Sequence, residues 1–149
     1  MYTISKEFRF EASHQLAGLP ENHPCTRLHG HSYVITIELT SINLNKVGFV
    51  KDYRELDLVK NFIDCTLDHQ HLNDVFKFNP SAENMAKFFY KKFRKDLPNL
   101  SAVIVKETEK TAAKYVQGHD EEDHIELETK TFDMTNFKSK NDGRKSSKK

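Results

Sequence analysis

The sequence predicts an α+β fold in which an antiparallel β-sheet carries two helices on one face. Segments with period-two alternation or many β-branched residues flank two amphipathic segments of helical period. The expected order is strand, strand, helix, helix, strand, strand, which is typical of helices packed against one side of an antiparallel sheet. A length of 149 residues suits a single domain with its own hydrophobic core.

Two strands are expected near the start of the chain. Residues 4–14 alternate in character, so one face of this strand should be buried. The residues on that face are Phe8, Phe10, Ala12 and His14. Residues 15–30 contain two glycines and two prolines and predict a loop. Residues 31–42 are rich in β-branched residues and predict the second strand, followed by a turn over 43–48 and a short strand at 48–50.

Two helices and two further strands are expected after this turn. Helical periodicity covers residues 52–67 and 81–97, and Ser81 is a good N-cap for the second helix. Their apolar faces consist of Leu56, Val59, Phe62 and Ile63 in the first helix and Met85, Phe88, Phe89 and Phe93 in the second. Residues 100–105 predict a buried strand, and residues 112–116 predict its partner.

Composition excludes several classes of protein. The formal net charge is +1, which offers no general argument for a nucleic-acid partner. No run of about 18 apolar residues indicates a membrane span, and the N-terminus lacks the pattern of a secretory signal. Two cysteines are too few for a disulfide framework, so we expect reduced thiols and a cytoplasmic location. Cys65 lies near the apolar face of the first helix and is expected to be a packing residue.

The composition shifts near the C-terminus, and we expect three regions. Residues 1–117 form the core, and residues 118–135 are an acidic stretch that could include a final strand. Residues 136–149 carry six basic residues and one acid and predict a disordered tail. A solvated tail is favoured over a weak electrostatic contact with RNA.

Three histidines predict a metal site. His29 and His31 are two residues apart, so on a strand both imidazoles project from the same face. His14 ends the first strand on its apolar parity and could supply a third nitrogen if the two strands pair. Three histidines leave one tetrahedral position open, as in catalytic zinc sites. The alternative is that these are ordinary surface or capping histidines.

Cys25 precedes the histidine pair and has two interpretations. It could be a fourth zinc ligand that closes a structural site. It could instead be a free thiol beside the metal, where a nearby cation makes the thiolate available near neutral pH. The spacing does not separate these interpretations.

Two further segments contain candidate functional residues. Asp68 and His69 follow the first helix, and the carboxylate could orient the imidazole as a proton relay. A histidine that interacts with a helix C-terminus is an equal alternative, and His71 is a weaker candidate ligand. Glu107 ends a predicted buried strand and could accept two adjacent N–H donors of a flat heterocycle. Taken alone, however, a surface pair with a lysine explains it better.

Together these segments resemble the 6-pyruvoyl-tetrahydropterin synthase superfamily, in its 6-carboxy-5,6,7,8-tetrahydropterin synthase branch. The resemblance extends from about Phe8 to Thr108 and rests on six ordered motifs. They are Phe10, Ala12 and His14; Cys25, His29, Gly30 and His31; Gly48, Val50, Asp52 and Tyr53; Leu67, Asp68, His69, Leu72 and Asn73; Pro80, Ser81, Glu83 and Asn84; and Lys106, Glu107 and Thr108.

The resemblance implies a fold and a role for each matched site residue. The fold would be the tunnelling fold, assembled into a barrel-forming homo-oligomer based on trimers or hexamers with active sites between subunits. The residues that would hold Zn²⁺ are His14, His29 and His31. Proton transfer would involve Cys25 as the acid/base thiol, with Asp68 and His69 as its relay. Glu107 would anchor the pterin ring.

The resemblance also implies a reaction. A lyase of this branch converts 7,8-dihydroneopterin triphosphate to 6-carboxy-tetrahydropterin, releasing acetaldehyde and triphosphate, in queuosine synthesis. The three residues between Cys25 and His29 resemble this branch more than the animal pyruvoyl enzymes, which have a longer gap. The alternatives are a 6-pyruvoyl-tetrahydropterin synthase, which eliminates triphosphate and keeps the carbons, and a non-catalytic Cys-His₃ zinc protein.

Overall fold

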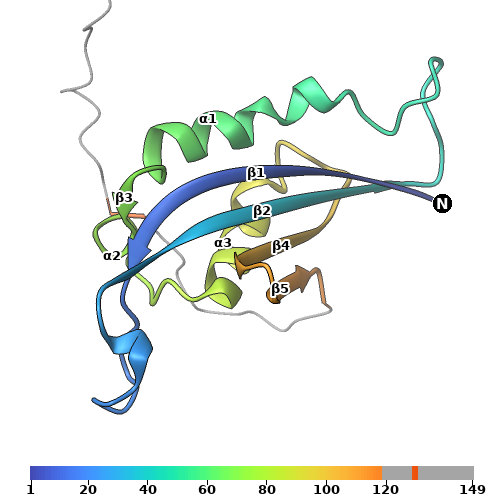
Figure 1. The fold of residues 1–149 in the computed structure, drawn as a ribbon. Helices are drawn as coiled ribbons and strands as arrows, with labels where there is room; N and C mark the ends of the chain where they lie inside the picture. Colours follow the sequence, from blue (N-terminus) through green and yellow to red (C-terminus); the bar gives the residue numbers. More distant parts are fainter. Residues whose placement is uncertain (119–128, 131–149) are drawn as a thin grey trace, which may run out of the picture.

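The computed structural model describes residues 1–118 and 129–130 (Figure 1). The elements in chain order are β1 Tyr2–His14, the 3₁₀ turn η1 Pro24–Thr26, β2 His29–Ser41, the 3₁₀ turn η2 Tyr53–Leu56, α1 Asp57–Thr66, β3 Gln70–His71, α2 Leu72–Val75, α3 Ala82–Phe93, β4 Leu100–Thr108 and β5 Thr111–Val116. The five strands form one sheet in the order β3-β1-β2-β4-β5. All neighbours are antiparallel except β1 and β3, so the predicted α+β class is confirmed with one short parallel strand added.

The long pair of β1 and β2 forms the centre of the molecule. Their register starts at Tyr2 opposite Ser41 and continues without interruption to His14 opposite His29. Gly30 permits this close approach at the end of the pair, because a Cβ there would lie 3.2 Å from the carbonyl oxygen of Ala12. The strand therefore begins at His29, two residues before the predicted start.

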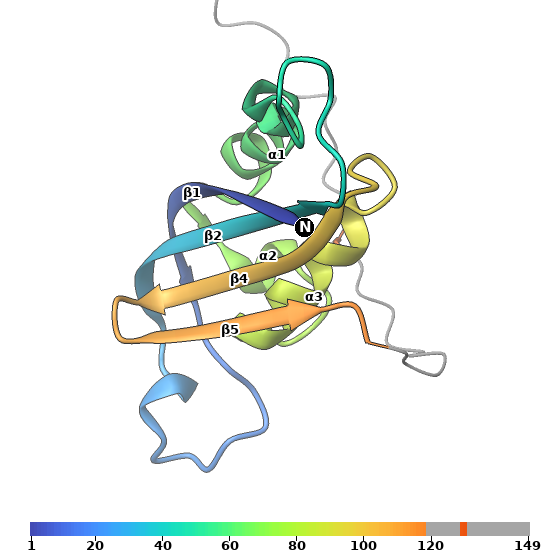
Figure 2. The same cartoon turned by 90° about the vertical axis from the view of Figure 1, so that its right-hand side faces the viewer.

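The helices pack against one face of the sheet, as the sequence predicted. Figure 2 shows α2 and α3 behind the strands. The core between the layers includes Phe8, Phe10, Ile35 and Ile37 from the sheet and Val59, Ile63, Met85 and Phe89 from the helices. Burying one such side chain stabilises the fold by roughly 1.5–3 kcal/mol. Ser81 caps α3 by accepting a hydrogen bond from the backbone N–H of Asn84, as expected.

Two local predictions were wrong. Residues 48–50 are not a strand, because the Asn45 side chain accepts hydrogen bonds from the N–H groups of Val47 and Phe49 and closes the loop on itself. Cys65 is exposed and does not pack in the core. The buried stripe of α1 contains Val59 and Ile63, and a residue two positions after Ile63 points to the opposite side of the helix.

The acidic stretch and the basic tail lie outside the described residues, apart from residues 118, 129 and 130. Thr129 forms an isolated antiparallel bridge with Phe76, and the N–H of Lys130 donates to the carbonyl of Val75 at 2.8 Å. The three-region division of the chain stays a prediction. Within the described segments, no helix has the length and hydropathy needed to cross a membrane.

Candidate functional site

Three histidines meet where β1 and β2 end together. His14 and His29 are direct cross-strand partners, and His31 lies two residues further along β2 on the same face. One possible ligand nitrogen from each ring lies within 4.8 Å of the other two. The pairing of the two strands therefore builds the site that the spacing predicted, and three imidazoles leave room for one further ligand on a tetrahedral metal.

Backbone carbonyls orient two of these rings. The Nδ1–H of His14 donates to the carbonyl oxygen of Pro80 at 2.8 Å, and the Nδ1–H of His29 donates to that of Arg27 at 2.7 Å. Each ring then presents an unprotonated Nε2, which is the usual arrangement of a metal-binding histidine. The two Nε2 atoms lie 2.9 Å apart, so their lone pairs repel unless a cation lies between them.

His31 supports the same conclusion from another direction. Its Nε2 is buried and has no hydrogen-bond partner in the described part of the chain. Leaving a buried polar atom unpaired costs about 1–3 kcal/mol. A metal ion among the three rings would satisfy this nitrogen and relieve the repulsion between the other two, so the residues fit a metal.

Burial keeps the ligands in their metal-binding form. It lowers the pKa of His14 below the ordinary 6.5, although the hydrogen bond to Pro80 and the charge of Glu107 oppose the shift; the neighbouring imidazoles lower the pKa slightly further. Burial also lowers the pKa of His31, with His29 as the second cause. Neutral imidazole is the form that binds a metal. These two ligands therefore stay neutral, and able to bind a cation, at a pH where a free histidine would already be protonated.

The lowered pKa values predict how the stability of the metal-free protein depends on pH. Well above pH 6.5, His14 and His31 are neutral in both the folded and the unfolded state, whereas just below 6.5 they bind more protons in the unfolded chain because their pKa values are lowered by folding. The free energy of unfolding should therefore fall as pH decreases through this window. Urea unfolding of the metal-free protein at pH 7.5 and 5.5 measures it, and His14→Gln should weaken the dependence. A stability that rises toward pH 5.5 would contradict the assignment.

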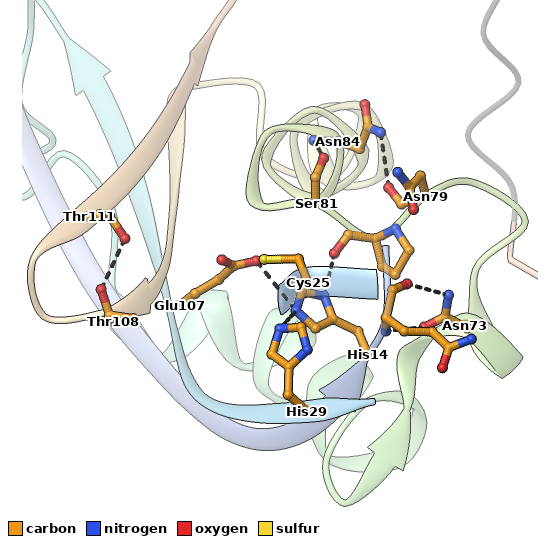
Figure 3. A network of polar contacts seen from close by, with 12 residues as sticks. His14, Cys25, His29, Asn73, Asn79, Ser81, Asn84, Glu107, Thr108 and Thr111 are labelled. Atoms are coloured by element: carbon orange, nitrogen blue, oxygen red, sulfur yellow. Dashed lines mark hydrogen bonds and ion pairs between the residues drawn. The ribbon is translucent and has the colours of Figure 1, made fainter. Parts of the chain in front are cut away.

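Cys25 lies in η1, in the loop that connects β1 to β2. It is a free thiol of intermediate exposure. Figure 3 shows its side chain directed toward the same region as His14, His29 and Glu107. In the described residues, the group with atoms close enough to share a metal consists of the three histidines without Cys25. This arrangement supports a thiol beside the metal more than a fourth ligand.

Glu107 lies near the end of β4 and faces His14. One of its carboxylate oxygens is 3.9 Å from His14 Nε2, too far for a hydrogen bond, and that oxygen is buried with no partner among the described residues. Burial raises the pKa of Glu107, and nearby Glu83 adds to the rise while His14 opposes it. The carboxylate lines a cavity of about 250 Å³ with Glu83, Leu16 and Thr111. It is therefore an unpaired acceptor at a cavity wall rather than half of a surface pair with lysine.

Asp68 and His69 form a contacting pair. His69 Nδ1 lies 3.0 Å from an Asp68 carboxylate oxygen, and the other oxygen accepts from the backbone N–H of Glu11 at 3.0 Å. That bond is the main reason why the pKa of Asp68 is lowered. The N–H of His69 also donates to the carbonyl of Glu11 at 2.7 Å, which holds His69 at an uncommon φ of 59°.

This pair opens on the other side of the sheet from the three histidines. His69 and His71 line a groove of about 480 Å³ together with Glu11, Ser13 and Ser32. Those strand residues alternate with His14 and His31, so their side chains project from the opposite face. His31 also contributes to the lining of the groove, although the His31 ring packs edge-on against that of His14. Within one chain, the structure thus brings together His14, His29, His31, Cys25 and Glu107, and it places Asp68 and His69 elsewhere.

Some parts of the site were not expected from the sequence. Pro80 contributes a backbone carbonyl, which no side-chain pattern reports. Tyr33 is fully buried and packs edge-on against His14 and His31, with ring centroids 5.9 and 5.5 Å away. Its place two residues after His31 on the same strand face could have indicated this contact.

Comparisons with known proteins identify a family and a fold for the chain. A model of the family described as 6-pyruvoyl tetrahydropterin synthase matches residues 3–118. The 6-carboxy-5,6,7,8-tetrahydropterin synthase of Synechocystis sp. is 38% identical over 127 residues, covering 77% of this chain and 93% of that protein. The protein of the same name from Aquifex aeolicus is 31% identical over 132 residues, covering 64% and 81%. The structure of 6-pyruvoyl tetrahydropterin synthase from Caenorhabditis elegans has a TM-score of 0.66 at 23% identity, covering 78% of this chain and 96% of that one, which supports the fold.

Proposed function

This chain belongs to the 6-pyruvoyl tetrahydropterin synthase family, and from that premise we propose that it is a zinc-dependent 6-carboxy-5,6,7,8-tetrahydropterin synthase. The observation that carries the proposal is the set of three histidines at the end of β1 and β2, with an unpaired carboxylate facing them from β4. The names of the relatives from Synechocystis and Aquifex favour the carboxy product.

The substrate is 7,8-dihydroneopterin triphosphate, and each residue of the site has a part in its conversion. Glu107 accepts hydrogen bonds from the adjacent N–H donors of the pterin ring, because its buried oxygen has no other partner. His14, His29 and His31 hold Zn²⁺, which supplies a Lewis acid that stabilises negative charge on the side-chain oxygens of the substrate. Cys25 takes up and returns a proton at the substrate side chain, which is cleaved to release acetaldehyde and triphosphate.

The position of Asp68 and His69 implies that the active site is shared between subunits. Both residues lie on the opposite sheet face from the histidines of their own chain. We therefore infer that they act as the proton relay in the active site of a neighbouring copy. The sheet can make such an assembly, because β5 is its edge and β1 pairs with β3 only at Ala12 and Ser13. Exposed strand edges pair readily with other chains. A homo-oligomer is therefore part of the proposal.

The alternatives are weaker. A structural Cys-His₃ site needs the thiol within bonding reach of the metal, and the group of potential ligands in the described residues does not include Cys25. A 6-pyruvoyl-tetrahydropterin synthase would use the same ligands and the same pterin anchor, so the product decides. The product enters queuosine synthesis in the proposed pathway, and the cytoplasmic location stays a prediction.

The proposal is tested by incubating the zinc-loaded protein with 7,8-dihydroneopterin triphosphate and measuring both small products. Cleavage of the side chain predicts acetaldehyde and triphosphate in equal amounts. Triphosphate without acetaldehyde would favour the pyruvoyl product. The absence of both products would contradict the proposal that the chain is an enzyme of this family.

A further inference from the structure

We propose that Asn73 and Asn79 are positioning residues that fix the backbone beside Cys25 and so keep the thiol in place for proton transfer. The role of the thiol in this inference rests on the proposed function. The clamp itself rests on four side-chain hydrogen bonds and one backbone hydrogen bond, which are present whatever the reaction is.

Each asparagine binds both backbone groups of one loop residue. Asn73 accepts from the N–H of Gln15 at 2.9 Å and donates to its carbonyl at 2.8 Å. Asn79 accepts from the N–H of Ala17 at 3.0 Å and donates to its carbonyl at 3.1 Å. A side-chain amide used in this way replaces a neighbouring strand, because it satisfies one donor and one acceptor together. The two amides therefore hold the chain on both sides of Leu16.

Leu16 connects this clamped segment to Cys25. Its N–H donates to the carbonyl oxygen of Cys25 at 2.8 Å. Within the described residues, the other hydrogen bond that joins the 18–28 loop to the rest of the fold runs from His29 Nδ1 to the carbonyl of Arg27. The remaining bonds of the loop are internal, such as that from the N–H of Cys25 to His23 Nδ1. The position of Cys25 consequently depends on the segment that Asn73 and Asn79 hold.

The clamp is continuous with the support of the metal site. Figure 3 shows Asn79 and Asn84 joined above the histidines, and the Asn84 side chain donates to the carbonyl of Asn79 at 2.9 Å. The next carbonyl, that of Pro80, orients His14. One short segment thus aligns a metal ligand and the loop that carries the thiol. A displacement near 1 Å of a reacting group can cost about 100-fold in rate, so this alignment matters for turnover.

The test compares Asn73→Ala and Asn79→Ala in a Cys65→Ser background, with Asn99→Ala as the control. Asn99 also donates to a backbone carbonyl, that of Thr40 at 3.1 Å, but at the far end of the sheet. Loosening the clamp should lower kcat about tenfold or more while KM and zinc content stay near those of the parent. Alkylation of Cys25 by iodoacetamide should become at least about threefold faster, because the loop opens more often. The control should change neither rate.

Unchanged kcat and alkylation in both variants would overturn the proposal. So would a parallel loss of kcat, substrate affinity, zinc and thermal stability, which would indicate a general structural role. Asn79→Asp keeps the acceptor for Ala17 but not the donor, and it serves if the alanine variant does not fold. Alkylation needs no pterin turnover, so it tests the clamp even if the parent protein forms no acetaldehyde.

Discussion

Replacing Cys25 by alanine should reduce acetaldehyde formation by about 100-fold to 10,000-fold, the usual contribution of a general acid/base group. Zinc should stay bound at the parent stoichiometry, because the three histidines form the ligand group without the thiol. The binding of a pterin should also persist, since Glu107 approaches from β4 and not from the Cys25 loop. Steady-state kinetics with zinc analysis of the purified variant measures all three quantities.

Cys65→Ala provides the matched control for this experiment. That thiol is exposed on α1, so its removal should leave zinc content and turnover unchanged. Loss of zinc from the Cys25→Ala protein, with Cys65→Ala unaffected, would place the thiol on the metal and contradict its assignment as a free acid/base group.

Replacing His29 by alanine should remove both zinc and activity. The ring is oriented by the carbonyl of Arg27, and its Nε2 lies 2.9 Å from that of His14. Loss of a residue that merely orients a ligand costs about 10–100-fold in metal affinity, so loss of the ligand itself should cost more. We expect a protein that is folded but nearly free of zinc after dialysis and that forms no measurable acetaldehyde.

His71→Ala is the control for the loss of an imidazole. His71 bonds Ser13 in the groove on the opposite sheet face, where its Nδ1 lies 3.0 Å from the serine hydroxyl. The variant should therefore keep its zinc. Full zinc in His29→Ala, or loss of zinc from His71→Ala, would show that the ligand set is wrong.

The central part of this site could be predicted from the sequence because it depends on strand periodicity. Alternation placed His14 on the buried face of β1, and the spacing of His29 and His31 placed both on one face of β2. The direct pairing of His14 with His29 is a finding of the structure, because β2 begins two residues before the predicted start. The helices were predictable for the same reason, since their apolar stripes have a clear period.

Other features could not be predicted, because they depend on contacts between segments far apart in sequence. The orientation of His14 comes from a backbone carbonyl 66 residues away. Residues 48–50 have the composition of a strand but form a loop, because the hydrogen bonds of the Asn45 side chain compete with strand pairing. The separation of Asp68 from Cys25 depends on which face of the sheet each meets, and a motif carries no information about that.

The proposed activity depends on zinc held by His14, His29 and His31. The most direct test is a titration of the zinc-stripped protein with Zn²⁺, in which acetaldehyde formation from 7,8-dihydroneopterin triphosphate is measured at each step. We predict that activity is absent without the metal, rises in proportion to added zinc, and reaches its plateau at about one ion per chain. A zinc-free protein that releases acetaldehyde at the full rate would contradict a zinc-dependent mechanism.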